Sequence, residues 1–172
     1  MLSQFYIRGD KEKAKEAFNI KPNNTHLLLM CGSMGCGPMK QLTEDLSQRL
    51  EPNCEISVVC GTNQKLFREL EQKFDSYPNI HIHGFVQDMS SLMDSADLYL
   101  TKPGGLSTSE ALAKALPMVL IDAVAGCIGI KRIVDDHHRL HLAALLPVQL
   151  LKILQRNLKQ LPPYLGSFEC IA

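Results

Sequence analysis

The sequence predicts an α/β domain built on a doubly wound parallel sheet, a Rossmann-like fold. Short apolar runs alternate along the chain with stretches in which apolar residues recur every three or four positions, as strands alternate with helices. The apolar runs are continuous, which is typical of strands that are buried on both faces of a parallel sheet. A chain of 172 residues with 45% hydrophobic content is long enough for one such domain and too short for two.

Composition disfavours several classes of protein. The 18 lysines and arginines balance the 18 aspartates and glutamates, so no net positive charge favours nucleic acid as a partner. No apolar run reaches the roughly 18 residues that a spanning helix needs, and the N-terminus does not resemble a signal peptide, so we expect a cytoplasmic protein. The six cysteines show no CxxC spacing, which favours reduced, mostly buried thiols over disulfides or zinc.

The N-terminal part of the chain predicts a connector, a strand, a glycine-rich turn and a helix, in that order. We expect residues 1–24 to form a connector that contains a charged helix over Asp10–Phe18. The apolar run Thr25–Cys31 predicts the first buried strand. It leads into the glycine-rich turn Gly32–Pro38 and then a helix, with apolar residues on one face at Met39, Leu42, Leu46 and Leu50.

The middle of the chain repeats this unit. Glu55–Gly61 predicts the second strand, and the apolar spacing of Leu66, Phe67, Leu70 and Phe74 predicts the helix after it. Ile80–Phe85 predicts a third strand in which isoleucines alternate with histidines. A short helix over 89–96, a strand at Leu98–Leu100, a further helix and a strand at Met118–Ile121 complete the set. Five strands that alternate with helices imply right-handed crossovers and a parallel sheet.

Two groups of histidines are candidates for metal ligands. His81 and His83 share one face of the third strand, but no third ligand is evident nearby, so we expect no metal there. The acidic and histidine residues between Asp135 and His141 are more simply the solvated face of a helix. We therefore predict no metal site and no cofactor.

The segment Leu98–Leu116 is the most informative stretch of the chain. Pro103-Gly104-Gly105 ends the strand, and Ser107 is in a position to cap the helix that follows. Glu110 lies three residues after Ser107, the spacing of a capping box. The free N–H groups of a helix behind a Gly-Gly turn form a ready anion site, and phosphate is the first ligand to consider. The same residues also suit an ordinary connection between a strand and a helix.

Topology links this turn to the earlier one. In the strand order 3-2-1-4-5, the first and fourth strands are neighbours, and ligands bind above the point between them. The turns at Gly32–Pro38 and at Pro103–Gly105 then open onto one crevice, which favours a phosphate-bearing ligand. Neither turn has the sequence of a P-loop or of the dinucleotide motif GxGxxG, so kinases and dehydrogenases are disfavoured.

Several motifs together resemble the C-terminal domain of family 28 glycosyltransferases, most closely that of monogalactosyldiacylglycerol synthases and processive diacylglycerol glucosyltransferases. They are Cys31–Gly37, Val58–Asn63, His83–Met89, Thr101–Leu112 and Leu116–Met118. The resemblance implies the C-terminal half of a GT-B fold, which binds a UDP-sugar donor. It also implies an inverting transfer of a hexose to a lipid acceptor without a metal ion.

The resemblance also implies roles for particular residues. Residues Gly104, Gly105, Leu106, Ser107 and Thr108 would hold the diphosphate, with Gly32, Ser33, Met34 and Gly35 facing it. Glu110 would bind the ribose hydroxyls, and Phe85 and Val86 stand where the family contacts uracil. No residue is predicted to be catalytic, because the family's base and acceptor site belong to an N-terminal domain, and this sequence begins about where the interdomain connector would be.

The predicted organisation is therefore a donor-binding domain over 25–127 and a divergent helical tail over 128–172. After Cys127 the sequence departs from the family pattern that contacts the donor sugar. The apolar stripe over 148–158 fits a helix packed on the sheet or, as the alternative, an interfacial helix at the inner face of the membrane.

Three functions stay open on the sequence alone. The first is the donor half of a lipid hexosyltransferase that needs an N-terminal domain for its acceptor. The second is the UDP-sugar-binding subunit of a two-chain glycosyltransferase, since some eukaryotic enzymes of the dolichol pathway divide these halves between two chains. The third is a non-catalytic nucleotide-binding domain.

Overall fold

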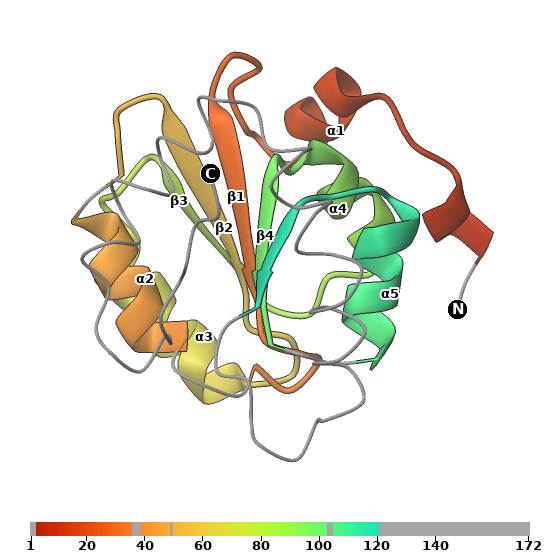
Figure 1. Cartoon of the computed structure of the whole chain (residues 1–172). Coiled ribbons are helices and arrows are strands. Elements are labelled where there is room, and N and C mark those ends of the chain that lie inside the picture. The colour runs from red at the N-terminus through yellow and green to blue at the C-terminus, as the bar shows by residue number, and fades with distance from the viewer. Residues whose placement is uncertain (1–2, 36–38, 49, 103–104, 121–172) are drawn as a thin grey trace, which may run out of the picture.

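The computed structural model describes residues 3–35, 39–48, 50–102 and 105–120, and it shows a parallel sheet between two layers of helices (Figure 1). The order of the strands is β3-β2-β1-β4-β5, which confirms the predicted order 3-2-1-4-5. The elements are η1 Ser3–Tyr6, α1 Lys11–Ala17, β1 Thr25–Met30, α2 Met39–Ser47, β2 Cys54–Val59, α3 Gln64–Phe74, β3 Ile80–His83, α4 Met89–Ser95, β4 Leu98–Thr101, α5 Gly105–Ala113 and β5 Met118–Leu120. Each predicted strand and helix up to β5 is thus confirmed, with ends that differ by a few residues. The predicted strand end at Ile121 and the whole tail over 128–172, including 148–158 and Asp135–His141, lie outside the described residues.

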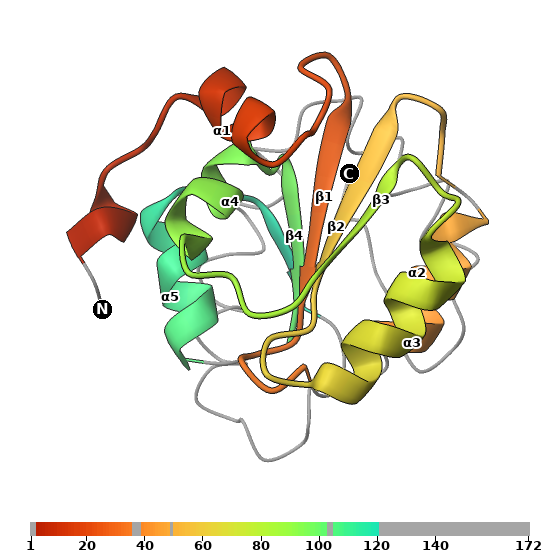
Figure 2. The ribbon, with the colours of Figure 1, turned by 180° about the vertical axis from the view of Figure 1, so that it is seen from behind.

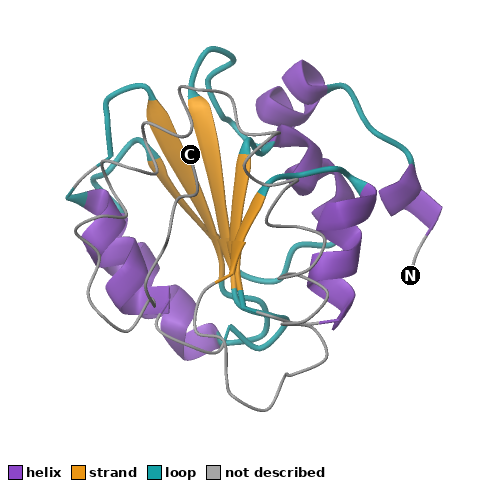
Figure 3. Ribbon diagram, in the orientation of Figure 1, coloured by secondary structure: helices purple, strands orange, loops and turns teal. Residues whose placement is uncertain are grey.

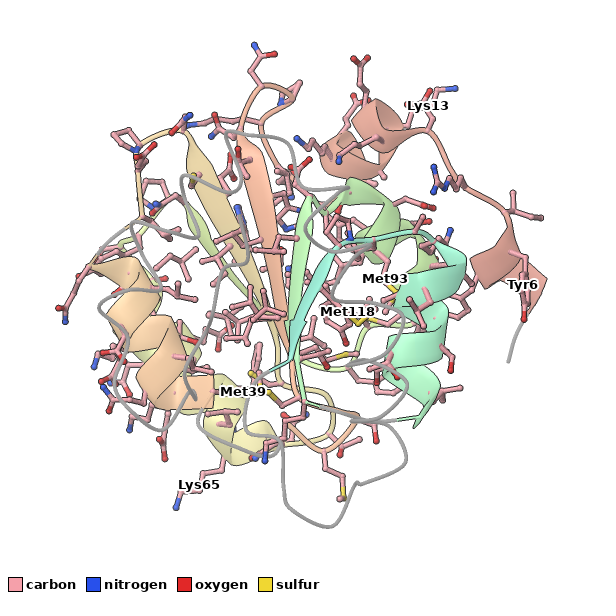
Figure 4. The ribbon with its side chains drawn as sticks, viewed as in Figure 1. Tyr6, Lys13, Met39, Lys65, Met93 and Met118 are labelled. Carbon is pink, nitrogen blue, oxygen red and sulfur yellow. The ribbon has the colours of Figure 1, made fainter. Side chains whose placement is uncertain are left out.

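The two faces of the sheet carry separate apolar cores. Helices α2 and α3 cover one face, and α1, α4 and α5 cover the other (Figures 1 and 2), while the strands fan out between them (Figure 3). The central strand β1 supplies both cores, because Leu28 and Leu29 point to opposite faces and are fully buried. Figure 4 shows Met39 on one side of the sheet and Met93 and Met118 on the other.

The N-terminal segment packs against the sheet domain. Helix α1 lies against α4, and Phe5 and Ile20 on either side of it are 2% exposed. Asp97, just before β4, accepts hydrogen bonds from the backbone N–H of His26 at 2.8 Å and from Lys11 Nζ at 2.5 Å. The helix predicted over Asp10–Phe18 is confirmed, while the assignment of residues 1–24 as a connector stays a prediction.

The histidines of β3 bind protein groups. His81 Nε2 lies 2.7 Å from a carboxylate oxygen of the buried Glu55, and His83 Nε2 lies 3.2 Å from Ser57 Oγ. Within the described part of the chain, no group of three or more histidine, cysteine or acidic side chains could hold a metal ion. No helix in that part is both long enough and apolar enough to cross a membrane.

Candidate functional site

The glycine-rich turns that follow β1 and β4 begin side by side. The two strands are parallel neighbours, and Met30 at the end of β1 pairs with Thr101 at the end of β4. The turns therefore lie at the same carboxyl edge of the sheet, which confirms that part of the sequence prediction. Figure 4 shows this edge near Lys65, in the first turn of α3, at the end of the molecule opposite Lys13.

Backbone hydrogen bonds tie three successive loops of this edge together. The carbonyl oxygen of Ser33 accepts from the backbone N–H of Thr62 at 2.9 Å and from its hydroxyl at 3.3 Å. Asn63, which caps α3, donates from Nδ2 to the carbonyl of Gly35 at 3.5 Å. On the other side, the N–H of Gly61 donates to the carbonyl of Gly84 at 3.2 Å. The loop after β1 is therefore held in place by the loop after β2.

Two glycines are required by this contact between loops. Gly35 and Gly61 have φ values of +54° and +58°, which side chains rarely adopt. A Cβ atom on Gly61 would lie 2.0 Å from the carbonyl oxygen of Ser33, and one on Gly35 would lie 2.4 Å from that of Cys60. Both positions need glycine because the backbones approach too closely for any side chain.

Helix α5 begins earlier than the sequence predicts. Its first residue is Gly105, so Ser107 lies within the first turn and is not the N-cap, and the predicted capping box is wrong. The helix thereby includes three residues, Gly105, Leu106 and Ser107, that a helix capped by Ser107 would leave out. The free N–H groups of its first turn then belong to Gly105, Leu106 and Ser107. The preceding Gly104, also predicted to bind the ligand, lies outside the described residues.

Glu110 lies in the second turn of α5, too far from the helix start to act as a cap. Its side chain is partly buried, and burial raises the pKa of its carboxyl group above the ordinary 4.5. The carboxylate accepts no hydrogen bond from another residue in the described ranges. A half-buried carboxylate without a donor is well suited to accept hydrogen bonds from a ligand.

Three large apolar side chains are exposed along the same edge. Met34 follows β1, Phe85 follows β3 and Leu106 is the second residue of α5, and their exposed fractions are 66%, 66% and 61%. Val86 is half-buried and packs against the core under α4 and α5, and Thr108 faces the interior with 7% exposure. The edge therefore offers apolar surface beside the N–H groups of the first turn of α5, which have no partner within the helix.

The sequence alone predicts no role for Thr62 and Asn63, although both form hydrogen bonds to the loop after β1. The signal was present, because Gly61-Thr62-Asn63 ends one of the motifs that carry the resemblance. The Asn63 to Gly35 hydrogen bond joins residues that are 28 positions apart in the sequence. The pattern of residues within one loop cannot predict such a contact.

The fold and this edge define a Rossmann-like domain with its candidate site at the switch point of a doubly wound sheet. Residues 26–123 match the family model of the glycosyltransferase family 28 C-terminal domain. This match covers more than half of the chain, and the chain belongs to that family.

Curated proteins with a similar sequence are consistent with this family assignment. The chain is 36% identical over 109 residues to a processive diacylglycerol β-glucosyltransferase of Staphylococcus carnosus, which covers 63% of this chain and 28% of that protein. It is 34% identical over 125 residues to the corresponding protein of Bacillus licheniformis, covering 72% of this chain and 32% of that protein. The chain thus spans about a third or less of the length of the curated relatives that it matches.

Solved structures show the same fold at low identity. MurG of Acinetobacter baumannii superposes with a TM-score of 0.61 and 18% identity, over 91% of this chain and 46% of that one. WaaG, a glycosyltransferase involved in lipopolysaccharide biosynthesis, superposes with a TM-score of 0.59 and 23% identity, over 90% of this chain and 43% of that one. HepE of Anabaena, in complex with UDP and glucose, superposes with a TM-score of 0.52 and 15% identity, over 94% of this chain and 53% of that one.

Proposed function

We propose that the carboxyl edge of the sheet binds the nucleotide part of a UDP-sugar. The observation that carries the proposal is the position of the free N–H groups of α5 beside the loop Gly32–Gly35, on neighbouring strands, in a chain of this family. The diacylglycerol glucosyltransferase relatives and the UDP complex of HepE support UDP as the nucleotide.

In this proposal each part of the nucleotide has its own contacts. The diphosphate binds the N–H groups of Gly105, Leu106 and Ser107, where the dipole of α5 favours negative charge. The loop that begins at Gly32 closes over the other side of the diphosphate. The ribose hydroxyls donate to the partly buried carboxylate of Glu110, and the uracil ring lies against the exposed Phe85.

The proposed reaction is the transfer of a hexose from the donor to a lipid acceptor of the diacylglycerol type, as the names of the relatives indicate. The relatives are about three times as long as the matched segment, so we assign the acceptor site and the catalytic base to residues beyond the described edge. A lipid acceptor also implies a peripheral contact with the inner face of the membrane.

A nuclear magnetic resonance titration of the isotope-labelled chain with UDP tests the location of the site. We expect the largest amide shifts at Gly32–Gly35, at Phe85 and at Gly105–Ser107. Shifts concentrated at the opposite edge, for example on α1, or no shifts at millimolar UDP, would overturn the proposal.

A transfer assay tests the reaction. We expect no transfer from UDP-glucose to diacylglycerol by this chain alone, and transfer when the N-terminal half of a relative is added. Transfer by the chain alone would show that the base lies within it.

A further inference from the structure

The hydroxyl group of Tyr99 is buried and has no hydrogen-bond partner among residues 3–35, 39–48, 50–102 and 105–120. Tyr99 lies on β4, its side chain is 0% exposed, and it packs among apolar residues under α4 and α5. Among the residues that the structure describes, its hydroxyl oxygen is the one buried side-chain polar atom that has no hydrogen-bond partner. An unpaired buried hydroxyl is costly, and phenylalanine would fill the same space without that cost. The presence of tyrosine instead of phenylalanine at this position therefore needs an explanation.

The surroundings of the hydroxyl point toward the candidate site. The side chains of Thr101, at the end of β4, and of Ser107, in the first turn of α5, lie close enough to lower the pKa of the phenol, against the larger effect of burial, which raises it. The hydroxyl of Thr101 already donates to the carbonyl of Lys102 at 3.3 Å, so its oxygen is left as an acceptor. Burial raises the pKa of Tyr99 above its ordinary 10.0, so the phenol keeps its proton and remains a donor.

We propose that Tyr99 is a positioning residue for the donor diphosphate, and that it acts through Ser107. When the ligand is bound, the Tyr99 hydroxyl donates to the Ser107 oxygen, and the Ser107 proton is then directed at a phosphate oxygen. This inference rests on the proposed function of the edge. It gives a reason for a hydroxyl that is buried near Ser107, in the first turn of α5, and that bonds to no residue in the described ranges.

The variant Tyr99→Phe separates this role from a structural one, because the two readings predict different changes. The substitution removes an unsatisfied buried hydroxyl, so the melting temperature should stay equal or rise. The affinity for UDP should fall about three- to tenfold, as expected for the loss of one hydrogen bond. Pyrophosphate affinity should fall by the same factor, and calorimetry measures both. A fall in melting temperature, or an unchanged affinity for UDP, would overturn the inference.

A double-mutant cycle tests the route through Ser107. In the Ser107→Ala background, Tyr99→Phe should cause no further loss of UDP affinity, since the group that it orients is gone. Equal losses in both backgrounds would overturn the coupling. Tyr77→Phe is the matched control, because Tyr77 is 44% exposed, packs on Phe74 and precedes β3 at the opposite edge.

The outcome for the unmodified chain separates the two proposals. If the wild-type chain binds UDP and Tyr99→Phe binds it equally well, only the role of Tyr99 is refuted. If the wild-type chain does not bind UDP, the proposed function and this inference are both refuted.

Discussion

At the scale of single residues, Glu110 is the position where a substitution best separates an effect on ligand binding from an effect on folding. The early start of α5 leaves Glu110 no role as a cap, and its carboxylate has no donor among the described residues. We predict that Glu110→Gln leaves the melting temperature nearly unchanged but lowers UDP affinity on the order of tenfold, because charged hydrogen bonds become neutral ones. A UDP titration by calorimetry, beside a thermal melt, measures both.

Pyrophosphate provides the control for this variant, since it contains no ribose. Its affinity should be the same for the wild type and for Glu110→Gln. An unchanged affinity for UDP would remove Glu110 from the site, and an equal loss for pyrophosphate would indicate a general disturbance of α5.

The buried His26 and the half-buried His83 give the free energy of unfolding a specific dependence on pH. His83 Nε2 lies 3.2 Å from Ser57 Oγ, Ser57 Oγ lies 2.9 Å from His26 Nε2, and His26 Nδ1 lies 3.1 Å from Ser95 Oγ. The Ser95 hydroxyl donates to the carbonyl of Leu92 and therefore accepts from His26 Nδ1. With both imidazole rings neutral, the Ser57 hydroxyl donates to His26 Nε2 and accepts from His83 Nε2, so every group in this hydrogen-bonded row donates once. Burial lowers the pKa of His26 and of His83 from 6.5 to about 4.

We predict that the free energy of unfolding falls as the pH drops from 6.5 to about 4. In this window the unfolded chain binds protons that the folded chain does not, so acid favours unfolding, and the stability is fully present above 6.5. The contribution of His26 is on the order of 3 kcal/mol by the lower end of the window. Urea unfolding across this range measures it, and His26→Gln should flatten the dependence. An equal slope in the variant would contradict the assignment.

The start of α5 shows where local sequence stops being sufficient at this scale. Ser107 and Glu110 have the spacing of a capping box, but a serine and a glutamate three positions apart can also lie inside a helix. Pro103-Gly104-Gly105 permits several starting points, and α5 extends over Gly105–Ala113, so that Ser107 lies inside it. From the sequence alone, Tyr99 looks like an ordinary core residue of its strand. The burial of its hydroxyl becomes visible only once the helices are packed on the sheet.

At the scale of elements, the loops of the site contain glycines of two kinds. Gly61 is structural, because its positive φ and its contact with Ser33 exclude a side chain. Gly105 is different, because a Cβ there would meet no atom within 4 Å. Open space over the first turn of α5 is where we place the diphosphate.

We predict that Gly105→Ala keeps or slightly raises the melting temperature and lowers UDP affinity at least roughly tenfold. Alanine is up to about 1 kcal/mol better than glycine in a helix, while its methyl group occupies the space proposed for phosphate. Thermal melts and UDP titrations of the variant measure the two effects. Unchanged binding would place the phosphate elsewhere.

Gly61→Ala is the matched comparison. It should cost on the order of 3 kcal/mol or more in the free energy of unfolding, because the backbone of the Ser33 loop must move. Denaturant unfolding measures this loss. A variant as stable as the wild type would show that the two loops are not tied as described.

At the scale of the whole molecule, the sequence was sufficient for the topology. Continuous apolar runs such as Thr25–Cys31 identify strands buried on both faces, and the crossover rule leaves few ways to arrange five of them. The strand order then places both glycine turns at one edge. The hydrogen bonds that join the loops were not predictable, because they depend on distances between segments far apart in the sequence.

The central claim is that the two turns hold a diphosphate between them, and a comparison of UDP with UMP tests it most directly. Calorimetric titrations of the same preparation with each nucleotide should show UDP binding roughly tenfold or more tightly, because the second phosphate adds charge-assisted hydrogen bonds from α5 or from the Gly32 loop. Equal affinities for UDP and UMP, or no binding of either, would contradict the claim.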